Sequence, residues 1–266
     1  MEKTVSPISI SVDELDLAIR QGRFPYLLDV RRSPRYDEAA DTISGARRRD
    51  PEQMPQWQHG IPADAAIVVF CVYGHEVSQG VAAGLLQLGY NVAYLEGGIE
   101  AWRAMGLPLG PKPPASPGIW LTRQRPKIDR IACPWLLRRF IDPDAQILYV
   151  PSEDVAATAK KLGGTAFDMP GAEYGHHGEY CSFDAFLSRH GLGSNPGLAL
   201  LARIVRGADT GQLDLAPQAA GLLAVSLGLS EKFQDDDAML TAAMPVYDAL
   251  YAWCSRTVSE LPQAAR

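Results

Sequence analysis

The chain has 266 residues, a formal net charge of −6 at pH 7, and 47% hydrophobic and 21% charged residues. This composition is typical of a soluble globular protein, and the length suits two compact domains. The negative net charge argues against a general nucleic-acid-binding protein, because such proteins normally carry a basic surface.

The sequence carries no signal for secretion or membrane insertion. Its first seven residues lack an apolar core, and no apolar run approaches the ~20 residues of a membrane-spanning helix. Its four cysteines, Cys71, Cys133, Cys181 and Cys254, form no Cys-x-x-Cys pair and fit a reducing compartment better than a disulfide framework. We therefore expect a cytoplasmic protein without membrane association, and the sequence does not indicate its oligomeric state.

The first part of the chain alternates short apolar runs with helix-like stretches. Residues 26–30, 66–70 and 92–95 are rich in Val, Ile, Leu and Tyr, which predicts parallel strands in an α/β layer. Residues 79–88 place apolar side chains at helical spacing, and Gly89 stands where a left-handed helix cap belongs.

Cys71 lies between the strand predicted at 66–70 and the helix predicted at 79–88. Backbone N–H groups of such a turn converge on the sulfur, and the positive end of the following helix stabilises a thiolate. Ligand sites of open α/β sheets lie at this carboxyl edge of the strands. A lone cysteine is more often a plain core residue, but the flanking motifs favour a functional thiol.

Those motifs resemble the rhodanese family over about residues 8–110. They are Asp-Val-Arg at 29–31, Ile-x-Gly-Ala at 43–46 and a long closing signature at 88–108. The resemblance implies a parallel sheet with flanking helices and no required cofactor. It also implies that Cys71 takes a sulfane sulfur from a small-molecule or protein donor as a persulfide and passes it to an acceptor. The substrate-binding residues that it implies are Val72, Tyr73, Gly74, His75, Glu76, Val77, Asp29 and Arg31.

Glu76 departs from the rhodanese pattern, because many members have Arg or Lys in this loop. A carboxylate there repels an anionic donor such as thiosulfate. The missing arginine also argues against a phosphatase, whose Cys-x5-Arg loop clamps a phosphoryl group. His75 either supplies a switchable positive charge or forms hydrogen bonds within the loop.

A proline-rich segment divides the chain. Residues 109–117 contain four prolines, which predicts a stiff, extended linker between domains at 1–108 and 118–266. In the second domain the pattern predicts strands and then helices, which makes it a mainly helical α/β domain. The expected strands are 119–122 and 146–150, and the helical patterns lie at 196–206, 216–229 and 238–256.

The second domain resembles the ChrB-like C-terminal domain of chromate resistance over about residues 119–256. The matching stretches are 127–143, 167–184, 206–209 and 216–224. The resemblance implies a role in chromate or metal stress. Some members have a DNA-binding N-terminal half, but a rhodanese-like domain occupies that place here, so we do not expect transcriptional regulation.

Two histidines between glycines, His176 and His177, suggest a metal site because the flexible backbone can turn both rings toward one point. Cysteine with histidine would favour zinc, whereas carboxylates with histidine suit manganese or iron. The alternative is that both rings form hydrogen bonds inside a turn. The further candidate ligands are Glu173, Glu179, Cys181, Asp129 and Asp209, with Asp184 nearby.

A basic run at 123–139 suggests oxyanion binding, because planar guanidinium groups bind tetrahedral oxyanions through paired hydrogen bonds. Pro134 suits the first position of a helix with Cys133 as its cap, which would place these side chains at a helix N-terminus. Such runs are more often solvated, but interleaved apolar residues indicate a buried side. The candidates for a chromate-type oxyanion are Arg123, Arg130 and Arg138.

Two functions stay open on the sequence alone. The first is a sulfurtransferase whose second domain binds a metal ion or an oxyanion. The second is a non-catalytic metal- or oxyanion-sensing protein that uses its rhodanese module for protein contacts.

Overall fold

The computed structural model describes residues 8–260. They form two compact units. The main boundary lies between Pro113 and Pro114, inside the proline-rich segment, and residues 20–22 group with the second unit. The expected linker spans 109–117, but its first three residues belong to the first unit. They form β7 (Leu109–Pro111), which pairs antiparallel with β3 (Asp41–Ile43). Proline is tolerated there because this two-stranded ribbon leaves strand edges unpaired.

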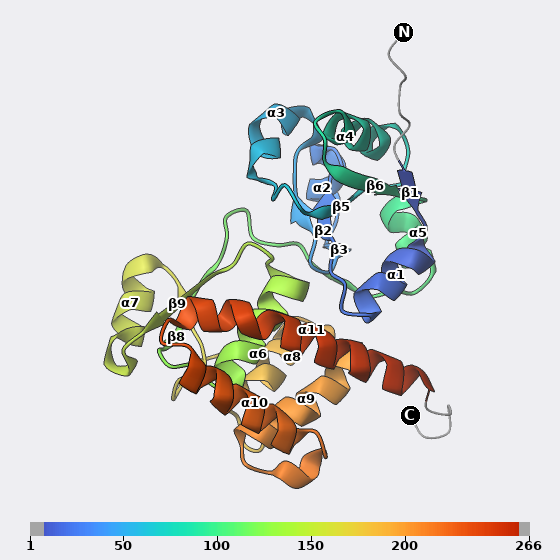
Figure 1. Cartoon of the computed structure of the whole chain (residues 1–266). Helices are drawn as coiled ribbons and strands as arrows, with labels where there is room; N and C mark the ends of the chain where they lie inside the picture. The colour runs from blue at the N-terminus through green and yellow to red at the C-terminus, as the bar shows by residue number, and fades with distance from the viewer. Residues whose placement is uncertain (1–7, 261–266) are drawn as a thin grey trace. The chain divides into compact units, whose positions relative to one another are not determined.

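The first unit is built on a parallel five-stranded sheet in the order β1-β6-β5-β2-β4 (Figure 1). Its strands are β1 (Ile8–Ile10), β2 (Tyr26–Asp29), β4 (Arg47–Arg48), β5 (Ala66–Phe70) and β6 (Asn91–Leu95). Its helices are α1 (Val12–Arg20), α2 (Ser33–Glu38), α3 (Met54–Trp57), α4 (Glu76–Gln87) and α5 (Gly98–Ala104), with 3-10 turns η1 (Pro51–Gln53) and η2 (Gln58–Gly60).

Apolar side chains project from both faces of this sheet, and each face contributes to its own core. Val68 and Phe70 of β5 join one core with Leu15 of α1 and Trp102 of α5. Their neighbours along β5 join the other core, with Leu85 of α4. The sheet is therefore covered on both faces, which explains why its strands are continuous apolar runs.

The predicted elements of the first unit are confirmed. The three expected strands are β2, β5 and β6, with ends that differ by one residue at most. The expected helix is α4, which begins at Glu76, three residues earlier than its apolar pattern indicated. Gly89 has φ +88°, the left-handed conformation predicted for it.

The second unit has a parallel sheet of three strands in the order β10-β8-β9, together with a set of helices (Figure 1). The strands are β8 (Ile119–Arg123), β9 (Gln146–Val150) and β10 (Thr165–Ala166). The helices are α6 (Asp129–Leu136), α7 (Val155–Leu162), α8 (Ser182–Arg189), α9 (Pro196–Asp209), α10 (Ala219–Lys232) and α11 (Asp236–Glu260). Short turns are the π-helical η3 (Leu137–Ile141) and the 3-10 turns η4 (Ser152–Asp154), η5 (Leu192–Ser194) and η6 (Leu213–Leu215).

The expected helix start at Pro134 is wrong. Helix α6 begins at Asp129, and Pro134 lies inside it. A proline has no N–H, so the carbonyl of Arg130, four residues earlier, loses its helical donor. The Tyr149 hydroxyl donates to that carbonyl at 2.9 Å and replaces the missing bond.

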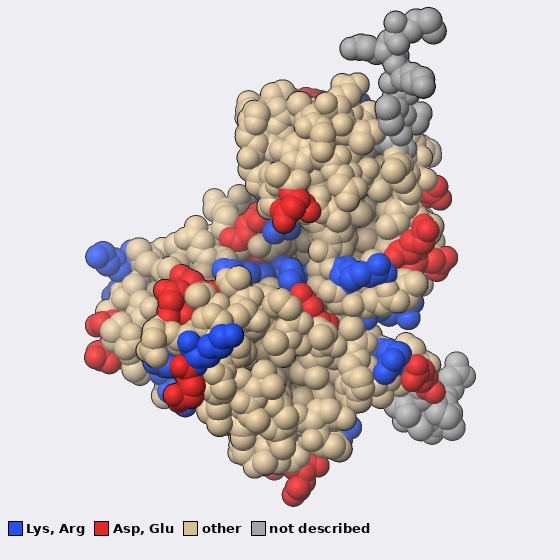
Figure 2. Space-filling model, in the orientation of Figure 1, with Lys and Arg blue, Asp and Glu red and all other residues tan. Residues whose placement is uncertain are grey.

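Two surface properties bear on the expected partners. Among residues 8–260, no helix is both long enough and apolar enough to cross a membrane. Figure 2 shows both acidic and basic side chains on the visible face of the second unit.

Candidate functional site

Cys71 follows β5 directly, and its loop leads into α4. The residue is 6% exposed, and its Sγ lies 3.2 Å from the Ser78 Oγ. The Ser78 hydroxyl is also 3.3 Å from the carbonyl of His75, to which it can donate. One hydroxyl can therefore donate either to the loop backbone or to a Cys71 thiolate.

Gly98, a glycine with positive φ at the start of α5, lies against the loop around Cys71. Gly98 has φ +59°, and a Cβ on it would lie 2.5 Å from the carbonyl oxygens of Cys71 and Val72. The N–H groups of Ile99 and Glu100 donate to these same carbonyls, at 3.0 and 3.1 Å. The start of α5 therefore holds the Cys71 loop in place, which gives Gly98 of the closing signature a physical role.

A pocket of about 500 Å³ opens at this loop. Cys71 lines it, and so do all the expected loop residues except Gly74. Gly74 faces the other way, since a Cβ on it would lie 2.4 Å from the Leu95 carbonyl oxygen. The charged lining residues are Arg31, Arg32, Arg35, Arg103, Glu38, Glu76 and Glu100.

Asp29 and Arg31, both expected to bind substrate, have different roles in the structure. Asp29 is 1% exposed, does not line the pocket, and accepts a 2.6 Å bond from the Arg31 guanidinium. Thr42 Oγ1 donates to the same carboxylate at 2.8 Å. Asp29 thus fixes Arg31 at the pocket wall and balances its charge, rather than contacting a substrate itself.

Most of the pocket's other arginines are also paired with acids. Arg103 contacts Asp41 at 2.7 Å, and Arg35 lies 3.5 Å from Glu38. Arg32 differs, because it is exposed and forms no ion pair within the described part of the chain. The pocket therefore holds one uncompensated arginine, Arg32, near the exposed carboxylate of Glu76.

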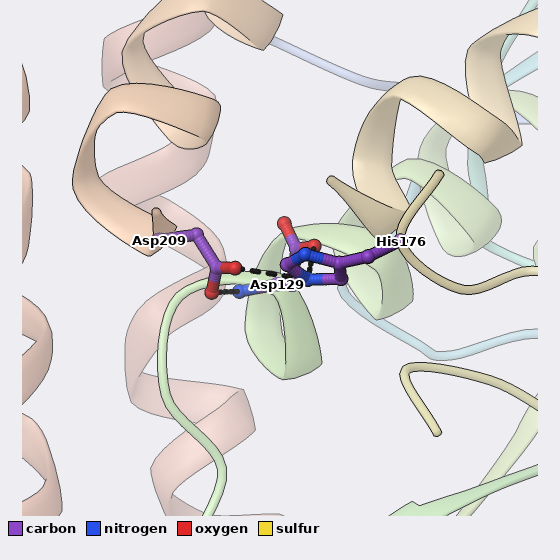
Figure 3. Close-up of side chains that lie close together, drawn as sticks. All are labelled: Asp129, His176 and Asp209. Atoms are coloured by element: carbon purple, nitrogen blue, oxygen red, sulfur yellow. Dashed lines mark hydrogen bonds and ion pairs between the residues drawn. The ribbon is translucent and has the colours of Figure 1, made fainter. Parts of the chain in front are cut away.

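A second cluster of titratable side chains lies in the second unit and centres on His176 (Figure 3). The His176 Nε2 is 3.5 Å from Asp129 Oδ2, 3.4 Å from Asp168 Oδ1 and 3.1 Å from Asp209 Oδ2. Three carboxylates from distant parts of the sequence therefore meet at one ring nitrogen.

Different elements supply the members of this cluster. Asp129 begins α6 and Asp209 ends α9, whereas Asp168 follows β10 with φ +51°. Ser182, the first residue of α8, holds two of them together. Its N–H donates to Asp129 Oδ2 at 2.5 Å, and its hydroxyl donates to Asp168 Oδ1 at 2.9 Å.

The expected oxyanion arginines separate into two groups. Arg123 and Arg130 both contact Asp168 Oδ2, at 3.1 and 3.3 Å. Arg138 lies in η3 and forms no ion pair with the cluster carboxylates in the described residues. The structure therefore places a pair of arginines, rather than three, beside the His176 cluster.

Electrostatics couples the members of this cluster. The hydrogen bond with Asp129 and the three negative charges raise the pKa of His176 to about 9, although burial opposes this shift. Burial raises the pKa of Asp209 to about 7, and the charges of Asp129 and Asp168 act in the same direction. Among residues 8–260, His176 is therefore the ion-pair partner of both Asp129 and Asp209, and Arg130 acts on Asp209 from farther away.

Several expected metal ligands lie outside the cluster. His177 is exposed and pairs through its backbone with Tyr180, and Glu179 is also exposed. Glu173 pairs with Arg189. Cys181 is not part of the Asp129–His176–Asp209 set, but it is buried beside Asp129. Its Sγ donates to Asp184 Oδ2 at 3.4 Å, and burial together with the Asp129 and Asp184 carboxylates raises the pKa of its thiol.

Sequence reasoning missed Asp168 and Ser182. Asp168 comes two residues after the short strand β10, and this position near a strand's carboxyl end is the signal that could have singled it out. Ser182 had no such signal, because its role depends on two carboxylates that lie 14 and 53 residues away in sequence.

Known protein families match both units. The family model described as the C-terminal domain of ChrB matches residues 120–254, and the rhodanese-like domain model matches residues 11–105. The chain belongs to both families. The predicted family membership and the mixed α/β fold are thereby confirmed.

Relatives of known name match each unit separately. Protein ChrB of Cupriavidus metallidurans is 41% identical over 132 residues, which are 50% of this chain but only 39% of that protein. The thiosulfate sulfurtransferase GlpE of Pseudomonas putida is 34% identical over 92 residues, or 34% of this chain and 81% of that protein. A rhodanese-related protein from Thermoplasma volcanium is similar in structure, with TM-score 0.34, 25% identity, and coverage of 38% of this chain and 96% of that one.

Proposed function

We propose that this rhodanese-like, ChrB-like chain is a sulfurtransferase that carries sulfane sulfur as a Cys71 persulfide. The observation that carries the proposal is the placement of Cys71 on a charged pocket, in a loop fixed by the start of α5. The thiosulfate sulfurtransferases related to the first unit support the same reaction class.

The chemistry balances with a donor and an acceptor alone. Cys71 loses its proton, and the thiolate attacks the outer sulfur of thiosulfate or a persulfide. A new S–S bond forms at Cys71, the donor S–S bond breaks, and sulfite or a thiolate leaves. A nucleophilic acceptor such as cyanide then takes the outer sulfur as thiocyanate and regenerates the Cys71 thiolate.

The residues around Cys71 have distinct roles in this proposal. Ser78 Oγ, at 3.2 Å, donates to the thiolate or to the inner persulfide sulfur. Arg32 supplies the positive charge for an anionic donor, and Glu76 opposes it. Sulfane sulfur carried on a protein or a neutral molecule avoids that repulsion, so the pocket favours such donors over thiosulfate.

Mass spectrometry and cyanolysis test the proposal directly. After incubation with a sulfane-sulfur donor, the peptide that contains Cys71 should gain one sulfur, and cyanide should release it as thiocyanate. Cys71→Ser should abolish both signals while the melting temperature stays near the wild-type value, because the swap is nearly isosteric. Cys133→Ser is the matched control, since Cys133 is fully buried in the second unit. Sulfur found on Cys133 or Cys181 instead would refute the proposal.

The alternative is a rhodanese module that only contacts other proteins. The exposed Tyr73, 59% accessible beside the pocket, favours it. This alternative predicts no cyanide-labile sulfur on Cys71 at any donor concentration, so the same assay separates the two functions.

For the second unit we propose ligand binding in chromate or metal stress, in line with its family. A chromate-type oxyanion is one candidate ligand, because Arg123 and Arg130 lie together and the Arg123 Nε is buried without an acceptor in the described residues. Asp168 already contacts both guanidinium groups, so an oxyanion would have to compete with that carboxylate.

A further inference from the structure

The His176 cluster contains more hydrogen-bond acceptors than donors. One oxygen from each of Asp129, Asp168 and Asp209 lies within 3.5 Å of the same ring nitrogen. A protonated ring nitrogen carries a single hydrogen and can satisfy only one of these oxygens well. The convergence therefore exceeds what His176 needs as a hydrogen-bonding partner.

Asp129 shows the imbalance most clearly. Its side chain is fully buried, and its Oδ2 accepts from the Ser182 N–H at 2.5 Å. Its Oδ1 is buried and has no hydrogen-bond partner in the described structure. A buried, unpaired carboxylate oxygen is costly unless a cation binds it. Figure 3 shows this carboxylate beside the His176 ring, at the centre of the cluster.

The position of Asp209 makes its ionised carboxylate electrostatically unfavourable for a separate reason. It is the last residue of α9, where the partial negative charge of the helix end opposes a carboxylate. It also lies close to Asp129, since the Asp129 N–H is 3.5 Å from Asp209 Oδ1. A cation between the two carboxylates would relieve both the helix-end repulsion and their mutual repulsion.

The neighbouring arginines form their direct ion pairs with Asp168 rather than with Asp129 or Asp209, although the charge of Arg130 acts on Asp209 from a longer distance. Arg123 and Arg130 contact Asp168, on its Oδ2, whereas the Oδ1 of the same carboxylate faces His176. Among residues 8–260, Asp129 and Asp209 form ion pairs with His176 alone. These two carboxylates thus share one imidazole as their ion-pair partner, and imidazole is itself a metal-ligand group.

We propose that Asp129, His176 and Asp209 bind one divalent first-row metal ion, independently of the chemistry at Cys71. Their ligand atoms all lie within 4.8 Å of one another. Asp168, held by two arginines and Ser182, positions His176 from the side. One imidazole together with carboxylates is a ligand set that suits manganese or iron, whereas thiolate ligands would favour zinc. The His176 side chain is 44% exposed, so the ion keeps solvent-facing coordination positions for water or an exchangeable ligand.

The test uses the full chain without an affinity tag, stripped of metal with a chelator and then dialysed. Titration with Mn²⁺, followed by calorimetry and by the electron paramagnetic resonance of free Mn²⁺, should give one ion per chain. Bound Mn²⁺ should also raise the melting temperature, because it binds only the folded state. His176→Ala and Asp209→Asn should each weaken Mn²⁺ binding at least tenfold.

His177→Ala is the matched control. It removes the adjacent histidine, which is exposed and lies outside the cluster, and should leave the Mn²⁺ affinity within about twofold of wild type. Circular dichroism of each metal-free variant checks its fold. Where His176→Ala fails to fold, Asp209→Asn decides, because asparagine keeps the side-chain volume and removes the charge.

Three outcomes would overturn the proposal. One is a wild-type protein that binds no Mn²⁺, Fe²⁺ or Zn²⁺ at millimolar concentration. The second is equal loss of affinity in His177→Ala and His176→Ala. The third is a Mg²⁺ affinity that equals the Mn²⁺ affinity and does not change in His176→Ala. That result would indicate carboxylates that bind cations without a nitrogen ligand.

Discussion

Two buried aspartates, Asp29 and Asp129, illustrate how similar residues acquire different roles. Asp29 is satisfied within its own unit by the Arg31 guanidinium and the Thr42 hydroxyl. Asp129 is equally buried, but one of its oxygens has no donor in the described structure. A buried carboxylate whose oxygens are all satisfied by internal donors needs no further ligand, whereas a buried oxygen left unpaired is costly unless a cation or a hydrogen-bond donor binds it.

Local sequence could predict Cys71 but not the whole His176 cluster. Cys71 and its pocket loop are consecutive, so the strand before them and the helix after them are enough to place the thiol. Asp129, Asp168 and Asp209 come from three distant segments, and only the packed fold brings them together. The sequence predicts His177 as a ligand because it is next to His176. In the structure its backbone pairs with Tyr180 and its side chain is exposed, outside the cluster.

At the Cys71 pocket, Glu76→Arg should improve the use of thiosulfate. The change removes a negative charge and adds a positive one on the pocket wall. Because Glu76 is exposed, we expect a gain of about 1–2 kcal/mol in donor binding at low salt, or roughly 5- to 30-fold in kcat/KM. The gain should appear mainly in KM and should shrink as salt screens the charge.

Glu52→Arg is the control for this prediction. It makes the same change in net charge on the exposed residue Glu52 in η1, outside the pocket lining. It should change thiosulfate kinetics by less than about twofold. Equal gains in both variants would mean that net charge, rather than the position of Glu76, governs donor binding.

Among the secondary-structure elements, α6 shows why helix boundaries are hard to predict. Apolar runs predicted the strands correctly because buried parallel strands depend on their own residues. The start of α6 depends instead on Tyr149 of β9, which satisfies the Arg130 carbonyl that Pro134 leaves free. A prediction from local preference placed Pro134 at the helix start, where its missing N–H would cost nothing.

A double-mutant cycle tests this tertiary bond. Tyr149→Phe removes the hydroxyl and should lower the free energy of unfolding by about 1 kcal/mol in urea titrations. In a Pro134→Ala background, residue 134 can donate to the Arg130 carbonyl, so the same change should cost measurably less. Equal costs in the two backgrounds would show that Tyr149 does not substitute for the helical bond.

Within residues 8–260, each of the two units has apolar cores built from its own side chains. The cores of the first unit gather around β5, whereas Leu121 and Val155 belong to a core of the second unit. Each unit also carries its own candidate site, one at Cys71 and the other at His176. Separate cores allow each unit to unfold as its own cooperative transition.

Two matched glycine substitutions test this independence. A Cβ on Gly98 would lie 2.5 Å from backbone oxygens of the first unit, and a Cβ on Gly164 would lie 2.8 Å from the Ile119 carbonyl oxygen in the second. Each clash should cost more than about 1 kcal/mol and lower one calorimetric transition by about 5 °C. Gly98→Ala should lower only the temperature of the transition at which sulfurtransferase activity is lost. Gly164→Ala should lower only the temperature of the other transition. A single transition shifted equally by both substitutions would show that the units unfold as one.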